Sequence, residues 1–533
     1  MKGTRIKSKI IKLPACLPSV RKAGKLHLSP KGRHTPTLSL CMIVKNEEQN
    51  LTRCLDSIKE VADEIIIVDT GSTDRTVDIA RRFGAKVYCH AWEGSFSKVR
   101  NYSLEYASCE WILILDADEE LWKSDAPKLK ELLKGNNCEA ISLVVKNRSK
   151  NSTHEAYTNS LRLFRNFHGT YYKGSVHNII VCKGRCFVSP LSIIHHGYNL
   201  SEGKMEEKFV RTTSMLREQI KKDPQNPIPY RFLGVAYLDR GRYEEAVNES
   251  MKALELAEVK KLNRKNFLVS YYIISAGNYE KRRLKEAEYY ALKAVELDNK
   301  FLDGFCVLSF VYDSLKRYDR FFQVSENYLK LWNEIAKYPE RFPSYTFHTM
   351  GHKWRIHLYR GFNYLIRKQE EEGNFELDRA IQESSGITPC LNLLGNFYLE
   401  NNYLDKAEET FTRLLNVQEQ SGEVLFKIGL VKFKQRSFEE AIVYWRKVVE
   451  KEPAFFDIRL MICKINVILE KYEEVVIECN QLLKDLGLPR NVTLENFTDL
   501  ATLFKTLGER LEEMDYLPAA KTAFKICEDL KRL

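Results

Sequence analysis

Short apolar runs alternate with amphipathic stretches in the first half of the chain. The runs Leu38–Val44, Glu64–Asp69 and Trp111–Leu115 are almost continuously apolar, as expected of strands covered on both faces of a sheet. The stretches between them carry apolar residues at helical spacing, as at Leu51 and Leu55. This β-α-β-α order predicts an α/β domain with a mostly parallel sheet and helices on both faces.

Helical periodicity replaces this alternation after about residue 204, and a repeat emerges. The segments Leu394–Phe411 and Ile428–Trp445 align at a spacing of 34 residues, with Gly395 opposite Gly429. Further copies begin at Leu233 and Leu507, and weaker ones contain Ala287, Tyr312 and Val475. A repeat of this length predicts stacked pairs of helices.

These segments resemble the tetratricopeptide repeat, in which small residues let paired helices approach and large ones fill the gaps. The resemblance implies an all-α superhelix with a concave groove. Such grooves usually bind a peptide or protein partner, although the repeats would equally serve to stabilise the molecule. A superhelix also offers surfaces for a homo-oligomer.

The two patterns divide the chain into four parts. We expect a basic tail at 1–36, the α/β domain at 37–203, a connecting helix or linker at 204–228 and the repeat domain at 229–533. A chain of 533 residues is long enough for two or three domains, and its apolar content of 44% supports large cores.

Cysteine usage and hydropathy indicate the compartment. The 13 cysteines are scattered without a CxxC pair, which is typical of free thiols in a reducing compartment. No window approaches the roughly 18 uninterrupted apolar residues that a membrane helix needs. The N-terminal segment lacks a long apolar stretch and a clear cleavage site. We therefore expect a cytoplasmic protein.

The net charge of +11 comes from one end of the chain. Residues 1–46 hold eleven Lys or Arg and no Asp or Glu, so the remainder is close to neutral. The tail is interpreted as a solvated extension. The alternative is an arm that makes transient contact with a membrane surface or an acidic partner. No nucleic-acid partner is expected.

Four acidic residues follow the apolar run that ends at Leu115: Asp116, Asp118, Glu119 and Glu120. A bare cluster of carboxylates repels itself unless a cation lies among them. In extended backbone Asp116 and Asp118 share one face, and two converging carboxylates suit Mg²⁺ or Mn²⁺. The cluster therefore predicts a metal bridged to a diphosphate. The alternative is a solvated acidic turn that caps the next helix.

Other polar residues follow the neighbouring predicted strands. Asn46 and Glu47 come after the first strand, and Asp69 ends the second. Ligands of such sheets bind beyond the carboxyl ends of the strands. Arg100, near the start of a predicted helix, lies where an anion could be held, the alternative being a surface ion pair. Asp74 is interpreted as a helix cap.

The motifs together resemble a known family. "SLCMIVKNEEQNLTRCLDSI", "EIIIVDTGSTDRTVDIA", "FSKVRN" and "WILILDADEEL" look like family 2 glycosyltransferases of the Rossmann-like GT-A fold, over roughly 36–198. The likeness is closer to the subgroup with tetratricopeptide repeats after the catalytic domain. That subgroup includes peptide glycosyltransferases that place a sugar on a bacteriocin cysteine or serine. "YYKGSVHN" and "IIHHGYNLSEGK" support this likeness.

The resemblance implies roles for individual residues. The backbone near Ile43 and Val44 and the side chain of Asp69 would hold the nucleoside of a sugar nucleotide, most often UDP. Asp118 would be the principal metal ligand. Asp116 would contact the ribose or the nearby sugar, or serve as a further metal ligand. Asn46, Glu47 and Arg100 would line the donor site. Basic residues of a following segment would meet the diphosphate: His195, Lys208 and Arg211.

The acceptor side departs from the family pattern. His177 lies where such enzymes carry a histidine beside the acceptor or the metal. The subgroup often has Glu after this histidine, and this chain has Asn178. The role of base would then pass to His177, Glu119 or Glu120.

By resemblance, the reaction is a single inverting displacement on a nucleotide-sugar, without a covalent intermediate. We expect a peptide or protein acceptor, and a cell-surface glycan or lipid-linked sugar is the alternative. A hypothesis of another class is an inactive repeat scaffold for protein–protein interaction. A sugar nucleotidyltransferase would need a glycine-rich loop after the first strand, where this chain has "VKNEEQN".

Overall fold

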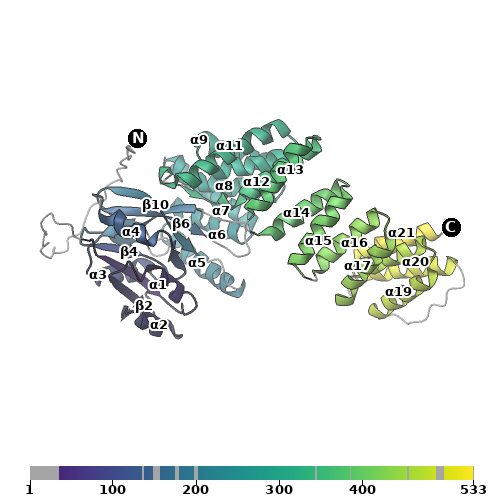
Figure 1. The fold of residues 1–533 in the computed structure, drawn as a ribbon, viewed down its shortest axis with the longest axis horizontal. Coiled ribbons are helices and arrows are strands. Elements are labelled where there is room, and N and C mark those ends of the chain that lie inside the picture. The colour runs from purple at the N-terminus through teal and green to yellow at the C-terminus, as the bar shows by residue number, and fades with distance from the viewer. Residues whose placement is uncertain are drawn as a thin grey trace. The chain divides into compact units, whose positions relative to one another are not determined.

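The computed structural model describes residues 35–134, 137–147, 157–174, 179–196, 202–342, 345–384, 386–419, 421–452, 455–487 and 497–531. Contacts divide the chain into two compact units, Met1–Ser385 and Gly386–Leu533. The first unit holds a sheet domain and a series of helices, and the second is helical (Figure 1). The domain bounds expected from the sequence stay a prediction.

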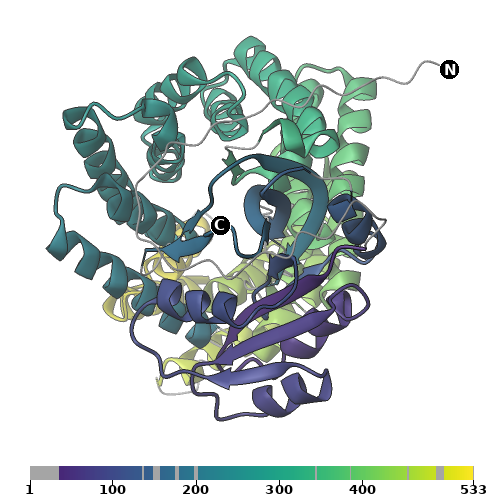
Figure 2. The ribbon, with the colours of Figure 1, turned by 90° about the vertical axis from the view of Figure 1, so that its left-hand side faces the viewer.

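The first four strands form the parallel half of one large sheet. Their order is β3-β2-β1-β4, and β1 pairs in parallel with both β2 and β4. Figure 2 shows these strands side by side in purple and blue. Their bounds are Leu38–Val44 for β1, Glu64–Asp69 for β2, Lys86–Cys89 for β3 and Trp111–Ile114 for β4. This half confirms the predicted α/β class.

The sheet continues in the order β7-β6-β10-β5 with mixed strand directions. The sequence did not indicate the antiparallel pairings of β7 with β4 and β6, or of β5 with β10. The bounds are Glu119–Leu121 for β5, Ala140–Asn147 for β6, Tyr157–Arg165 for β7 and Cys186–His195 for β10. Strands β8 (Tyr171–Lys173) and β9 (Ile179–Val181) form a separate small sheet.

Helices pack on both faces of the sheet, as predicted. Helix α1 buries Leu51, Leu55 and Ile58 on one side, the spacing that places them on a single helical face. These residues join Leu40 and Leu113 in one core, and α3 contacts β1, β2 and β8. The helix bounds are Leu51–Ile58 for α1, Thr76–Arg82 for α2, Phe96–Glu105 for α3 and Ala126–Lys134 for α4.

Helix α5 (Glu202–Lys222) starts the helical part of the first unit, and successive pairs follow it. The pairs are α6 (Pro227–Asp239) with α7 (Tyr243–Val259), α8 (Leu268–Glu280) with α9 (Leu284–Leu297), α10 (Leu302–Ser314) with α11 (Tyr318–Lys337), and α12 (Lys353–Ile366) with α13 (Glu370–Glu383). Short 3₁₀ turns lie at Arg264–Phe267, Pro339–Arg341 and Met350–His352.

The segment between α11 and α12 adds a strand to the sheet. Its strand β11 (Thr346–Phe347) pairs antiparallel with β7, and the hydroxyls of Thr158 and Thr346 lie 2.6 Å apart. The Asn159 side chain donates to the carbonyl of Phe342 at 2.9 Å. The first helical pairs are therefore joined to the sheet domain by hydrogen bonds that the sequence pattern did not predict.

The second unit consists of further helix pairs. They are α14 (Ile387–Glu400) with α15 (Leu404–Val417), α16 (Gly422–Lys434) with α17 (Phe438–Lys451), α18 (Phe456–Ile468) with α19 (Tyr472–Asp485), and α20 (Phe497–Glu513) with α21 (Leu517–Leu530). The repeat glycines allow the close approach of paired helices. A Cβ atom at Gly395 would lie 2.5 Å from the ring of Phe411, and one at Gly429 would lie 2.2 Å from Trp445.

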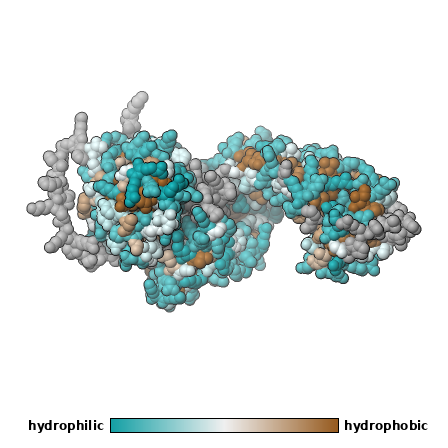
Figure 3. All heavy atoms as spheres, turned by 90° about the horizontal axis from the view of Figure 1, so that it is seen from below, coloured by the Kyte–Doolittle hydropathy of each residue, from teal (hydrophilic) through white to brown (hydrophobic). Residues whose placement is uncertain are grey.

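Hydrophilic residues cover most of the face drawn in Figure 3, and apolar residues occur there in small patches. Across the described part of the chain, every helix is too short or too polar to span a membrane.

Candidate active site

The carboxyl ends of several strands meet at one edge of the sheet. Val44 at the end of β1 pairs with Asp69 at the end of β2. His195 at the end of β10 pairs with Asn147 of β6 and with Glu119 of β5. The polar residues that follow these strands are therefore gathered at one edge of the sheet, as the sequence pattern predicts.

Asp118 forms an ion pair with His195. Its Oδ2 atom lies 3.2 Å from Nε2 of the imidazole, whose Nδ1 atom lies 2.7 Å from Oδ1 of Asn147. An amide oxygen only accepts hydrogen bonds, so Nδ1 carries a proton. Burial acts to raise the pKa of Asp118, but the hydrogen bond from His195 lowers it. Burial acts to lower the pKa of His195, and Asp118 raises it. The pair therefore favours carboxylate and imidazolium.

Helix α5 brings a second positive group to this pair. The charge of Lys208 contributes to lowering the pKa of Asp118 and opposes the protonation of His195. Arg211 lies on the next turn of the same helix and is exposed. The structure thus brings Lys208 to the carboxylates and places Arg211 on the solvent side of α5.

Asp116 is paired with Arg100 on α3. The Nη2 atom of Arg100 lies 2.6 Å from Oδ1 of Asp116, and its guanidinium lies over the ring of Tyr172 at 5.3 Å. The side chain of Arg100 is only 14% exposed. Arg100 therefore makes the ion pair considered as the alternative, with its own side chain largely buried and the carboxylate of Asp116 partly exposed. The neighbouring Asn101 binds the backbone of Tyr172 through both atoms of its amide.

Glu119 is buried next to Asp116. Its Oε1 atom is 2.6 Å from Nη2 of Arg162 on β7, and its Oε2 atom accepts from the backbone N–H of Asp116 at 2.9 Å. Its exposure is 2%. Burial raises the pKa of Glu119, with Arg162 acting against that effect and Asp116 adding to it. Glu119 thus holds the backbone that carries Asp116.

Glu120 points to the other side of β5, because successive side chains of a strand alternate. Its carboxylate lies 3.2 Å from Nε2 of His196 and 3.6 Å from Nε of Arg53. The side chain is 26% exposed. Of the two glutamates predicted as bases, Glu120 is the one with access to solvent.

Glu47 faces the aspartates from the loop after β1. Burial and the charges of Asp118 and Asp116 raise its pKa, against a hydrogen bond from Asn50. The preceding Asn46 adopts a positive φ of 55° and accepts from the backbone of Thr73. The loop is thereby tied to the segment after β2, and the carboxyl group of Glu47 lies within reach of the charges of Asp118 and Asp116.

The side chain of Asp69 stabilises the turn that follows β2. Its carboxylate accepts from the backbone N–H groups of Gly71 and Ser72, each at 3.0 Å to Oδ2. Gly71 has a φ of 102°, a conformation that glycine adopts without strain. A carboxylate offers about four lone pairs, so capacity for a ligand remains. Asp74 accepts from Thr76 at the start of α2, in keeping with a capping role.

The end of β1 lies beside this turn. Ile43 is half-buried, and the carbonyl of Val44 accepts from both the backbone N–H and the hydroxyl of Thr70. The two residues proposed to lie along the nucleoside are therefore fixed by hydrogen bonds between the ends of β1 and β2.

The described residues fit a metal ion whose coordination shell is completed by a second molecule. Among them, no three His, Cys, Asp or Glu side chains are grouped so as to hold a cation alone. Asp118 offers a carboxylate oxygen, and His195 offers Nε2 once that atom has lost its proton. Burial, with the charges of Asp118 and Asp116 adding to it, raises the pKa of Glu47. Mg²⁺ commonly takes one or two protein carboxylates and completes its shell with water and phosphate oxygens.

Some sequence expectations fall elsewhere. His177 and Asn178 lie outside the described residues, so the structure leaves their roles as predictions. Sequence reasoning missed Arg162, Asn147 and Arg53. Arg162 carried a weak signal, as an arginine between the apolar residues of "SLRLF", and Asn147 and Arg53 carried none.

Comparisons with known proteins agree with both halves of the chain. Residues 39–191 match the model of glycosyl transferase family 2, and residues 230–260 and 388–421 match that of the tetratricopeptide repeat. The SPbeta prophage-derived glycosyltransferase SunS of Bacillus subtilis is 29% identical over 246 residues, which cover 45% of this chain and 58% of that protein.

Two further relatives cover shorter stretches. A TPR repeat-containing protein of Synechococcus elongatus is 39% identical over 143 residues, 27% of this chain and 35% of that protein. A solved structure, glucosyl-3-phosphoglycerate synthase of Mycobacterium tuberculosis with Mn²⁺, UDP and glucosyl-3-phosphoglycerate, shares 24% identity over 21% of this chain and 44% of that chain. Its TM-score of 0.19 adds nothing to the fold assignment. The chain therefore carries a glycosyl transferase family 2 domain followed by tetratricopeptide repeats.

Proposed function

We propose that the protein transfers a sugar from a nucleotide-sugar, a UDP-sugar, to an acceptor in a metal-dependent, inverting reaction. The observation that carries the proposal is the ion pair of Asp118 with His195 at an edge of the sheet where Glu47 and Asp116 add further carboxylates. This arrangement lies at the end of the sheet where ligands of such folds bind.

Mg²⁺ or Mn²⁺ bound at Asp118 would neutralise the charge that develops on the leaving diphosphate. His195 lies in contact with Asp118 and would share that cation through Nε2 in its neutral form, with the Nε2 proton displaced by the metal and the Nδ1 proton kept toward Asn147. Lys208 supplies a further positive charge nearby. Asp116 is engaged by Arg100 and is better suited to hold the ribose or the sugar. Asp69 and the end of β1 would hold the nucleoside.

The acceptor group attacks the anomeric carbon while a base takes its proton. Glu119 is buried in its pair with Arg162, which favours Glu120 as the base among the described residues, beside the predicted His177. The protein contributes position and charge rather than a covalent nucleophile.

A peptide or protein is the proposed acceptor, because the repeats supply a stacked surface on which an extended chain can lie. The described cysteines are free thiols, which supports a reducing compartment such as the cytoplasm.

The test is release of free nucleotide from a panel of UDP-, GDP- and TDP-sugars with Mn²⁺ and a mixture of Ser-, Thr- and Cys-containing peptides. We expect one UDP-sugar to be consumed only when metal is present, with a peptide gaining the sugar mass. Consumption that is unaffected by a chelator would contradict the metal-dependent site. Consumption with no peptide modified would contradict the acceptor class alone.

A further inference from the structure

Strand β11 ends at the same edge of the sheet as the strands of the candidate site. It pairs antiparallel with β7, which itself pairs antiparallel with β4, so β11 runs in the same direction as β4. Its last residue, Phe347, pairs with Tyr157, and Tyr157 pairs in turn with Lys146 near the carboxyl end of β6. The next residue, His348, therefore leaves the sheet at the carboxyl edge, where His195 ends β10.

His348 is fixed by its backbone and by stacking of its ring. The backbone N–H donates to the buried carboxylate of Asp303 at 3.0 Å, and the ring stacks on that of Tyr272 at 5.3 Å between centroids. The Nε2 atom is buried and has no hydrogen-bond partner among the described residues. Because a buried polar atom without a partner is costly, this nitrogen indicates a hydrogen bond that a bound molecule supplies.

Asp239, the last residue of α6, lies within reach of the charge of His348. It is exposed to solvent, but burial still raises its pKa, so its carboxyl group is accessible and yet closely surrounded by protein. The charges of His348 and Lys208 act against that effect. Among the described residues, none donates a hydrogen bond to this carboxyl group. The adjacent Arg240 forms an ion pair at 2.8 Å with Glu206, which holds the end of α6 against α5.

Lys208 of α5 links Asp239 to the proposed donor site. Its charge acts on Asp239 and also on Asp118, and the helix that carries it packs against α6. The strand order gives a direction, because β2 and β1 would hold the nucleoside, Asp118 follows β4, and β11 lies beyond β4 on β7. A nucleotide-sugar that runs from the end of β1 across Asp118 therefore directs its sugar toward His348 and Asp239.

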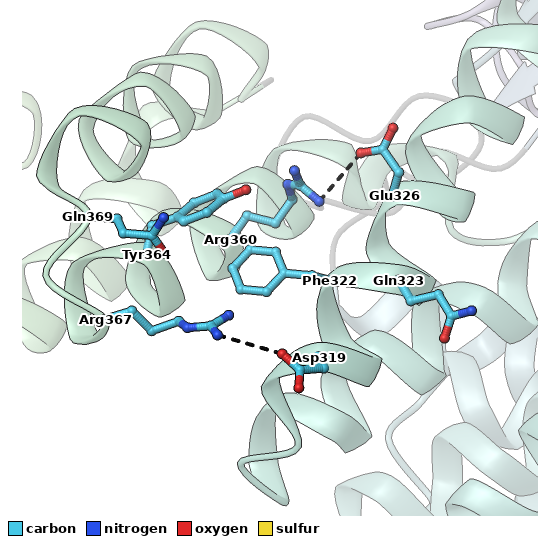
Figure 4. A pocket seen from close by; sticks show the side chains of 8 residues that line it. All are labelled: Asp319, Phe322, Gln323, Glu326, Arg360, Tyr364, Arg367 and Gln369. Carbon is cyan, nitrogen blue, oxygen red and sulfur yellow. Dashed lines mark ion pairs between the residues drawn. The ribbon is translucent and has the colours of Figure 1, made fainter.

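The cavity of about 560 Å³ between α11 and α12 offers a contrast. Figure 4 shows two of its arginines directed at acids of the same cavity. Arg367 lies 3.6 Å from Asp319, and Arg360 lies 3.6 Å from Glu326. The charged groups of that cavity are thus paired with one another within the protein, unlike the carboxyl group of Asp239.

We propose that Asp239 and His348 bind hydroxyl groups of the sugar that the nucleotide donor carries. The inference rests on the proposed transfer function and assigns part of its donor site to the helical region. A carboxylate can accept from two neighbouring hydroxyls, and such charge-assisted bonds are stronger than neutral ones. The Nε2 atom of His348 donates to or accepts from a further hydroxyl, according to its tautomer. UDP lacks the sugar, so it binds without contacting either residue.

The experiment is isothermal titration of the full chain with Mn²⁺ and without an acceptor. The ligands are UDP, UDP-glucose, UDP-galactose and UDP-N-acetylglucosamine, and the variants are Asp239→Asn and His348→Gln. Asp319→Asn is the matched control for the aspartate, since Asp319 is exposed on α11. His168→Gln is the control for the histidine, since His168 is exposed and follows β7 at the opposite edge of the sheet. Thermal unfolding of each variant reports that it is folded.

We expect wild type to bind UDP and at least one of the three UDP-sugars. Asp239→Asn should weaken binding of that UDP-sugar about fivefold to tenfold, because it removes a charged acceptor. His348→Gln should weaken it about threefold to fivefold, because it removes a neutral hydrogen bond. Both variants should bind UDP as wild type does, and both controls should leave the affinity for every ligand unchanged.

An equal loss of affinity for UDP and for the UDP-sugar in Asp239→Asn would overturn the inference, because the residue would then act on the nucleotide. Unchanged binding of the UDP-sugar in both variants would overturn it too, as would a wild type that binds UDP but none of the three UDP-sugars. A wild type that binds no UDP with Mn²⁺ would instead refute the proposed transfer function, and the inference with it.

Discussion

The pair of Glu119 and Arg162 predicts an effect on stability rather than on chemistry. Glu119→Gln keeps the shape of the side chain and an oxygen that accepts from the backbone N–H of Asp116. It leaves the charge of Arg162 uncompensated, in a site where the side chain of residue 119 is 3% exposed and that of Arg162 is 13% exposed. Two unit charges 4 Å apart attract by about 4 kcal/mol at an effective dielectric constant of 20. Breaking a buried pair costs about 3–5 kcal/mol.

A loss of this size should lower the unfolding midpoint of the sheet domain by on the order of 10 °C. Differential scanning calorimetry measures that midpoint, and the double variant Glu119→Gln with Arg162→Gln should recover much of it, since it removes the unpaired charge. The reasoning would be refuted by a Glu119→Gln variant of unchanged stability that has lost sugar transfer, because Glu119 would then act in the reaction.

Three further predictions concern other parts of the chain. Gly429→Ala should destabilise the second unit by about 1–3 kcal/mol in thermal unfolding, because the new Cβ would lie 2.2 Å from Trp445, whereas Gly422→Ala meets nothing closer than 3.9 Å and serves as the control. The carboxylate of Glu64 accepts hydrogen bonds from Lys86, Ser39 and Ser108. Burial acts to raise the pKa of Glu64, but these hydrogen bonds lower it to about 2. Its stabilisation is present above the ordinary pKa of Glu and is lost as the pH falls toward 2, so Glu64→Gln should cost about 2 kcal/mol at pH 7 in urea unfolding. The gap from wild type should close near pH 2, and a constant gap would contradict the lowered pKa. A fragment of residues 35–385 should resist limited proteolysis better than one of 35–226, because only the longer fragment keeps β11 and the bonds of Asn159. Equal resistance would show that β11 contributes nothing to the sheet.

The sequence predicted the strands that are covered on both faces of the sheet, and it predicted the polar residues at their carboxyl ends. Continuous apolar runs placed β1, β2 and β4, and Asp69, Asp116 and Asp118 fell at their carboxyl ends as expected. The antiparallel β7 and the added β11 could not be predicted, because pairing between Thr158 and Thr346 joins residues 188 positions apart with no local pattern.

The sequence predicted many residues of the site but few of the contacts between them. Charge and spacing indicated the carboxylates of the site. They did not indicate which carboxylates would form ion pairs with basic side chains of the protein. Arg162 lies on a strand far along the chain, so nothing near Glu119 indicated that it would be buried in an ion pair. The same holds for His195 and Asn147, which meet only because β10 and β6 pair in register.

Isothermal titration of the protein with UDP, with and without Mn²⁺, tests the central claim most directly. Asp118→Asn is the test variant, and Asp56→Asn, at an exposed pair with Lys59, is the control for a change of one charge. We expect wild type and Asp56→Asn to bind UDP only when Mn²⁺ is present, and Asp118→Asn to lose that binding. UDP binding that is equal with and without metal, or that survives in Asp118→Asn, would contradict a metal-dependent donor site at Asp118.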